Sequence, residues 1–205
     1  MTIRVTLVSA ALSTALREAR FDDDGPLDPA GREQARAAAP ALRTAGRVFA
    51  SPSVRCAATA ESLGLRATPT PALAGCAMGR WTGRTLAEVA AADEDGVARW
   101  LADPAAAPHG GESLLDLLAR VGGWLDALTA GEGATPAGEG APRVGGPVLA
   151  VVEPDVVRAA ALHALAAPAP AFWRLDVPPL TVTDLSGRAG RWNVRWGSPA
   201  HPPAG

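Results

Sequence analysis

One unit occurs twice near the N-terminus: a short apolar run followed by an Ala-rich helical segment. Residues 3–8 are mostly apolar without strict alternation, which is typical of a strand buried on both faces. Residues 29–43 then predict a helix with a proline in its first turn. Residues 47–50 and 53–63 repeat this order of strand and helix. Because a helical crossover returns the chain to a parallel neighbouring strand, the pattern predicts an α/β fold with a parallel sheet.

The second half of the chain extends the same plan. Residues 147–152 are the clearest buried strand, and residues 154–166 predict a helix that begins near a proline. Residues 85–129 predict helix with a break at 104–111, since apolar side chains from Leu114 onward recur at helical spacings. Three more short strands are predicted at residues 173–177, 180–185 and 192–196.

Length and composition indicate one domain. The 205 residues, of which 48% are hydrophobic, suffice for one substantial core and are few for two. We expect the domain to span residues 1–197 and a disordered tail to follow at 198–205. Residues 131–146 hold six glycines and two prolines, so they are predicted to form a flexible loop inside the domain.

Charge and targeting signals argue against several classes of partner. The formal net charge is −2 and no basic run occurs, so we expect neither nucleic acid nor a membrane surface as a partner. No apolar stretch approaches the roughly 20 residues of a membrane span, and no signal-peptide pattern is present, which predicts a cytoplasmic protein. Cys56 and Cys76 stand singly among small and apolar residues, which favours reduced core thiols over a metal site. We therefore expect no metal and no cofactor, and a small molecule or a protein as partner.

Five motifs follow one another along most of the chain. They are PLDPAGREQA at 26–35, SPSVRCAATAE at 51–61, GRWTGRT at 79–85, GGES at 110–113 and VVEPDVVRA at 151–159. In this order they closely resemble the motifs of the histidine phosphatase (phosphoglycerate mutase-like) superfamily. The resemblance covers about residues 3–196. It implies a three-layer α/β/α sandwich with a mostly parallel central sheet and an active site at the carboxyl ends of the strands.

The chain departs from the family where the chemistry should lie. The family's first strand ends in Arg-His-Gly, whose histidine is the nucleophile that accepts phosphate, whereas this chain has Ser9-Ala10-Ala11. The family's second histidine is replaced by Glu153. The resemblance also implies that Arg55 retains a phosphate-binding role and Glu112 that of the proton donor. A methyl group at position 10 cannot accept a phosphoryl group, so phosphohistidine chemistry is not expected.

The resulting pocket is predicted to have reversed its charge. Ser9 and Arg55 are expected to contact the ligand, together with Glu112 and Glu153. Loss of two cations and gain of an anion should weaken phosphate binding by several orders of magnitude, because one unit charge about 5 Å away contributes roughly 3 kcal/mol at an effective dielectric near 20. The site is then suited to an amine, a guanidinium or a neutral polar ligand. The alternative, equally compatible with the sequence, is that Arg55 and the two glutamates only neutralise one another, in a cleft that binds no ligand.

Three hypotheses for function follow. The first is a catalytically degenerate pseudophosphatase that binds a small molecule or a protein in the former active-site cleft. The second is a non-phosphatase acid/base enzyme, an isomerase, hydrolase or dehydratase, in which Glu112 and Glu153 share one proton. The third, a slow phosphatase, would use water activated by Glu153 with Arg55 holding phosphate.

Aromatic and basic residues near the motifs complete the set of candidates. Trp81 and His109 border the predicted pocket, and we include both as candidate ligand contacts. For Trp81 the alternative is to wedge its loop on the domain, and for His109 it is exposure to solvent. Trp100 and Trp124 lie on helical stripes that predict core positions. Arg158, on the helix after Glu153, is expected to pair with a nearby acid.

Overall fold

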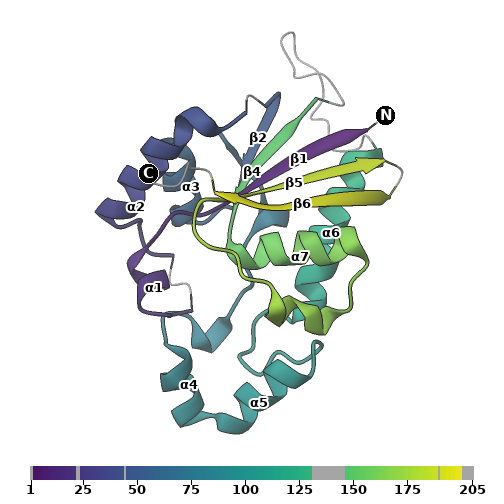
Figure 1. Ribbon diagram of the computed structural model, residues 1–205. Coiled ribbons are helices and arrows are strands. Elements are labelled where there is room, and N and C mark those ends of the chain that lie inside the picture. Colours follow the sequence, from purple (N-terminus) through teal and green to yellow (C-terminus); the bar gives the residue numbers. More distant parts are fainter. Residues whose placement is uncertain (1, 22–23, 44, 131–145, 189, 200–205) are drawn as a thin grey trace.

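The computed structural model describes residues 2–21, 24–43, 45–130, 146–188 and 190–199, with side chains described to residue 196. Six strands form one sheet in the order β3-β2-β4-β1-β5-β6 (Figure 1). The strands are β1 (Ile3–Ser9), β2 (Arg47–Ala50), β3 (Thr68–Pro69), β4 (Val148–Val152), β5 (Thr181–Arg188) and β6 (Arg191–Pro199). Strands β1 to β4 are mutually parallel, β5 runs antiparallel to β1, and β6 antiparallel to β5.

Helices cover the two faces of the sheet. The helices are α1 (Thr14–Arg17), α2 (Pro29–Ala38), α3 (Val54–Ser62), α4 (Leu86–Ala92), α5 (Glu94–Ala102), α6 (Leu114–Ala130) and α7 (Pro154–Leu165). Figure 1 shows α2 and α3 on one side of the sheet and α6 and α7 on the other. This arrangement confirms the predicted three-layer α/β/α sandwich with a mostly parallel sheet.

The side chains of the central strands divide between two apolar clusters. On β1, Ile3, Val5 and Leu7 pack against the face covered by α6 and α7, whereas Val8 packs with α2 and α3. Successive residues of a strand point to opposite faces, and both faces of β1 are buried because each carries a helical layer. The apolar runs at 3–8 and 147–152 therefore lack the alternation of a strand with one wet face.

Several helix starts follow from local sequence. Asp28, the N-cap of α2, accepts a hydrogen bond from the backbone N–H of Gly31 at 2.6 Å, and a proline occupies the first turn. Ser53 caps α3 by accepting from the N–H of Cys56 at 3.1 Å. At α7, Glu153 is the N-cap residue, but its side chain makes no capping hydrogen bond. That carboxylate contacts Arg55 instead.

Helices α4 and α5 extend beyond the sheet at the lower end of the molecule (Figure 1). They have a small cluster of their own, formed by Trp81, Val89 and Val97 with Phe21 and Trp100 packed against it. The carboxyl ends of β1, β2 and β4 meet at this end of the sheet, so the cluster lies next to the predicted active-site edge.

Some predicted elements differ from the structure. Residues 173–177 are not a strand: Ala169–Arg174 is a 3-10 helix that begins after Pro168 and includes Pro170, residues that cannot donate to a strand ladder. Helix α1 and strand β3 were not predicted, since neither is longer than four residues.

The predicted loop and tail fall largely beyond the described residues. Strand β6 extends to Pro199, two residues beyond the predicted end of the domain at 197, and residues 200–205 lie outside the described part of the chain. All of the predicted flexible loop at 131–146 except Gly146 lies outside it as well. Among the described residues, no helix combines the length and apolar character of a membrane span.

Gly31 allows α2 to pack directly on the chain that leaves β1. A Cβ at this position would meet the carbonyl oxygen of Leu12 at 2.1 Å, which a real side chain cannot tolerate. We expect Gly31→Ala to lower the free energy of unfolding by about 1–3 kcal/mol through overpacking, measured by urea denaturation. The matched control is Gly123→Ala on α6, where a Cβ meets nothing within 4 Å and alanine is the better helix former. Equal effects of the two substitutions would contradict this account.

Candidate functional site

The end of β1 uses Ser9 as a structural anchor. The Ser9 side chain is fully buried; its Oγ donates to the carbonyl of Pro178 at 2.6 Å and accepts from the N–H of Thr181 at 2.8 Å. These bonds hold the approach to β5 against β1. Ser9 is therefore not among the cavity-lining residues, although it was a candidate ligand contact.

Ala10 and Ala11 continue the chain past the sheet through backbone bonds. The N–H of Ala10 donates to the carbonyl of Val152 at 2.9 Å, and that of Ala11 donates to Oγ1 of Thr59 at 3.1 Å. Both methyl groups are buried in the apolar cluster beneath α2 and α3. No reactive side chain occurs at either position.

Arg55 and Glu153 form a buried ion pair across the junction of α3 and α7. Nη2 of Arg55 contacts Oε2 of Glu153, and their side chains are only 8% and 4% exposed. The other arginine amino group, Nη1, donates to Oγ of Ser13 at 3.2 Å. The structure thus brings two predicted site residues together, and their opposite charges neutralise each other.

The rest of the Glu153 carboxylate is also occupied. Its Oε1 accepts from Oγ of Ser53 at 2.7 Å and from the thiol of Cys56 at 3.3 Å. Burial, with the Glu153 charge as a further cause, raises the pKa of Cys56 well above its usual value, so this thiol stays protonated and acts as a donor. Both oxygens of Glu153 thus have protein partners, which is the condition for burying a carboxylate.

Glu112 is held by a different arginine. Its two oxygens accept from Nε and Nη2 of Arg120 at 2.8 and 2.6 Å, a bidentate pair. Nη1 of Arg120 also donates to the carbonyls of Ala72 and Ala74. Glu112 does not line the cavity described below. The structure therefore does not bring Glu112 and Glu153 together as two carboxylates facing one solvent-filled space.

Trp81 and His109 pack against one another in the core. Trp81 is fully buried and His109 is 1% exposed, with ring centroids 5.1 Å apart. Nδ1 of His109 accepts from the N–H of Gly111 at 3.0 Å, and burial lowers the pKa of the imidazole. The ring is therefore a neutral structural acceptor. Neither residue lines the cavity, so the wedge role considered for Trp81 agrees with its position, and His109 is not exposed.

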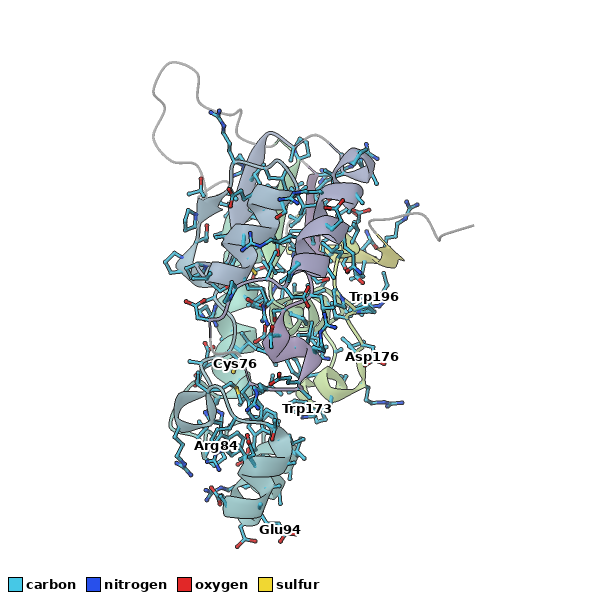
Figure 2. The ribbon with its side chains drawn as sticks, turned by 90° about the vertical axis from the view of Figure 1, so that its left-hand side faces the viewer. Cys76, Arg84, Glu94, Trp173, Asp176 and Trp196 are labelled. Atoms are coloured by element: carbon cyan, nitrogen blue, oxygen red, sulfur yellow. The ribbon has the colours of Figure 1, made fainter. Side chains whose placement is uncertain are left out.

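A cavity of about 430 Å³ lies at the carboxyl edge of the sheet. This volume is within the range of small-molecule sites. Arg55 and Glu153 form part of its wall, and Phe21, Trp100 and Trp173 contribute aromatic surface. Figure 2 shows Cys76 and Trp173 between the sheet and the α4–α5 helices, whose far end carries Glu94. Trp100, predicted as core, is thus a cavity residue, whereas Trp81 is the core residue.

Two cavity residues from the first turns of α7 complete the site. Asp155 accepts backbone hydrogen bonds from Cys76 at 2.6 Å and Val156 at 2.8 Å. Burial, together with the negative charge of Glu153, raises the pKa of Asp155 to about 6. Asp155 was not singled out from the sequence, although it lies in the 151–159 motif and its position two residues after Glu153 was the available signal.

Arg158 also lines the cavity, and among the described residues it forms no salt bridge with an acid. Its Nε donates to the carbonyl of Leu175 at 2.7 Å, and its guanidinium carbon lies 5.5 Å from the ring centroid of Phe172. This differs from the expected salt bridge with a neighbouring carboxylate. Leu175 lies in the segment 173–177 that was predicted as strand, and Phe172 directly precedes it, which explains why sequence spacing alone missed these contacts.

The described part of the chain contains no cluster of side chains that could bind a metal ion. No three side chains among its His, Cys, Asp and Glu residues lie close enough together to hold an ion. Cys56 and Cys76 are free thiols. Burial raises the pKa of Cys76 to about 12, so at neutral pH it is not a thiolate nucleophile.

The sequence of the chain matches one family. The model of the histidine phosphatase superfamily (branch 1) matches residues 12–198, and the chain belongs to this superfamily. The match begins directly after Ser9-Ala10-Ala11. A comparison with curated proteins gave no match.

Solved structures agree with this assignment. A mycobacterial glucosyl-3-phosphoglycerate phosphatase in complex with inorganic phosphate is 28% identical, with a TM-score of 0.77 over 96% of this chain and 98% of that chain. A protein described as mycobacterial hydrolase 2 is 25% identical, with a TM-score of 0.79 over 99% and 94%. The α-ribazole phosphatase of Shigella flexneri is 18% identical, with a TM-score of 0.79 over 98% and 99%, and this likeness concerns the fold alone.

The raised pKa of Asp155 makes stability depend on pH. The ordinary value is 3.8 and the folded value about 6, so between these values the folded state binds a proton that the unfolded state has released. Stability contributed by this proton is complete below pH 4 and is lost as the pH rises through 6. The difference between the two pKa values corresponds to about 3 kcal/mol.

Asp155→Asn should remove this dependence. We expect the stability of the variant relative to the wild type to increase by up to about 3 kcal/mol between pH 4 and pH 7, measured by urea denaturation at several pH values. The control is Asp95→Asn at an exposed position of α5, which should show no such trend. A stability difference between Asp155→Asn and the wild type that is independent of pH would contradict the assignment.

Proposed function

We propose that this chain is a pseudophosphatase: a histidine phosphatase relative that has lost phosphoryl transfer and binds a ligand in the former active-site cleft. The buried pair of Arg55 and Glu153 is the observation that supports it most directly. In the family, the corresponding arginine faces a phosphate dianion. Here a carboxylate occupies that partner position, so a phosphate group would have to displace a buried anion whose two oxygens both have hydrogen-bond donors.

The composition of the cavity wall supports the same proposal. Among the described residues that line the cavity, none is a histidine. His163 lies on α7 with Nε2 3.0 Å from Asp126, and His109 is buried beside Trp81. Ala10 supplies a methyl group at the position that the family's motif gives to the nucleophile. None of the described cavity residues could therefore carry a phosphoryl group on an imidazole.

The two alternatives receive less support from the geometry. An acid/base enzyme built on Glu112 and Glu153 needs both carboxyl groups at one cavity, but Glu112 is held bidentately by Arg120 away from it. A slow phosphatase needs Arg55 to hold phosphate while Glu153 activates water. In the structure, however, Arg55 and Glu153 are already hydrogen-bonded to each other.

Phosphatase assays test the proposal. We expect no hydrolysis of p-nitrophenyl phosphate or other phosphate monoesters above the rate without protein. Hydrolysis by the wild type that disappears in Arg55→Ala would overturn the proposal.

Phosphate binding gives an independent prediction. Glu153→Gln removes the anion while keeping a hydrogen-bond acceptor, so Arg55 should become able to bind phosphate. A unit charge about 5 Å away contributes roughly 3 kcal/mol at an effective dielectric near 20, or about a hundredfold in affinity. Isothermal titration calorimetry should therefore detect phosphate binding by the variant, at least about tenfold tighter than by the wild type. The control is Glu61→Gln, at an exposed position of α3, the helix that carries Arg55. This variant should bind phosphate as the wild type does.

A further inference from the structure

The cavity contains two opposite charges that do not neutralise each other. Asp155 and Arg158 lie three residues apart on α7, a spacing that places side chains on one face of a helix. Both line the cavity, yet among the described residues neither forms a salt bridge, with the other or with a third side chain, although the charge of Arg55 acts on Asp155. Adjacent opposite charges left apart in a partly enclosed space are unusual, because burial favours pairing.

Each side chain retains hydrogen-bonding capacity. A carboxylate accepts about four hydrogen bonds, and Asp155 receives two, both from backbone N–H groups. Arg158 uses only Nε, on Leu175, so within the described residues its two terminal amino groups have no acceptor. The contacts also fix both side chains in place: backbone bonds hold Asp155, and Phe172 and the Leu175 carbonyl hold Arg158. The pair is preorganised rather than loose.

The other charged groups of the cavity wall are already engaged. Arg55 is paired with Glu153. Arg20 contacts the carboxylate of Glu18 at 2.7 Å, and Asp24 accepts from the N–H of Val54 at 2.7 Å. Asp155 and Arg158 are consequently the charged groups best able to contact a ligand.

The remaining wall is largely aromatic. Trp100 and Trp173 meet edge to face with centroids 4.6 Å apart, and Phe172 meets Trp173 at 5.0 Å. Phe21 contacts Trp100 from the other side at 5.8 Å. Aromatic rings favour an apolar or aromatic body through buried area and edge-to-face contacts. Such a wall next to one carboxylate and one guanidinium favours a ligand with an apolar body and two opposite charges.

From this arrangement we infer that the cavity binds an amino-acid-like zwitterion with an aromatic side chain, its ammonium contacting Asp155 and its carboxylate contacting Arg158. A dianionic phosphate does not fit, since it would meet Asp155 and Glu153 with like charge. The inference rests on the proposed function, in which the cleft binds a ligand without phosphoryl transfer.

Three related probes test the inference. L-Phenylalanine carries both charges, 2-phenylethylamine lacks the carboxylate, and 3-phenylpropionate lacks the ammonium. Titration calorimetry of the wild-type chain near pH 7.5 should show that L-phenylalanine binds at least about tenfold more tightly than either analogue. Equal binding of one analogue, or no binding of L-phenylalanine at millimolar concentration, would overturn the inference.

Matched substitutions assign each charge to its partner. Asp155→Asn should weaken L-phenylalanine and 2-phenylethylamine but leave 3-phenylpropionate unchanged or tighter. Arg158→Gln should instead weaken L-phenylalanine and 3-phenylpropionate and spare 2-phenylethylamine. Asp95→Asn, exposed on α5, should bind all three as the wild type does. A uniform loss of all three probes in both cavity variants would indicate general damage to the site and would count against the assigned contacts.

The same samples distinguish failure of this inference from failure of the proposed function. If L-phenylalanine does not bind and phosphate monoesters are not hydrolysed, the inferred ligand class is wrong while the pseudophosphatase proposal stands. If monoesters are hydrolysed, the proposed function fails whatever the three probes do. Inorganic phosphate at millimolar concentration should not displace L-phenylalanine from the wild type.

Discussion

The candidate site is organised by the buried contact between Arg55 and Glu153. Arg55 comes from α3, which follows β2, and Glu153 precedes α7, which follows β4. Because β2 and β4 are adjacent and parallel, their carboxyl ends meet, and the two helix starts are brought within reach of each other. The pair therefore joins two strand–helix units at the bottom of the cavity. Removing either partner would leave an uncompensated buried charge, at a cost of about 3–5 kcal/mol.

Much of the fold could be predicted because burial leaves a clear pattern in the sequence. The apolar runs at 3–8 and 147–152 are strands between two helical layers, and the prolines at 29 and 154 begin helices. Residues 173–177 were predicted wrongly because an apolar, aromatic run does not by itself distinguish a strand from an irregular segment packed against other rings. In the structure, Trp173 meets Trp100, and this long-range contact overrides the local pattern.

The site was predictable only as far as the motifs reach. They placed Arg55 and Glu153 at the same edge of the sheet, and in the structure both residues line the cavity there. Sequence spacing could not reveal that Arg120 would bind Glu112. Nor could it reveal that the Ser9 hydroxyl would hydrogen-bond the backbone of the segment that leads into β5. For tryptophans, periodicity identifies the apolar face of a helix but not what covers that face. Trp100 accordingly borders the cavity, whereas Trp81, in the motif loop, is fully buried and packs against Trp100.

Two kinds of change at this cleft differ in their physical effect. Under the proposed function, an alanine at position 10 would remove a nucleophile but leave the attraction of the remaining cations for phosphate intact, so alone it would produce an inactive protein that still binds the family's substrates. The carboxylate of Glu153 acts on binding instead, because it neutralises Arg55 and adds a negative charge where a dianion would sit. Asp155 adds a second carboxyl group to the same wall, with a pKa of about 6 that leaves it mostly ionised at pH 7.5. In the function proposed here, the cleft has therefore changed the kind of ligand it favours as well as losing its chemistry. The guanidinium of Arg158, which uses only Nε on Leu175 within the described residues, is then the group best placed to attract the anionic group of that ligand.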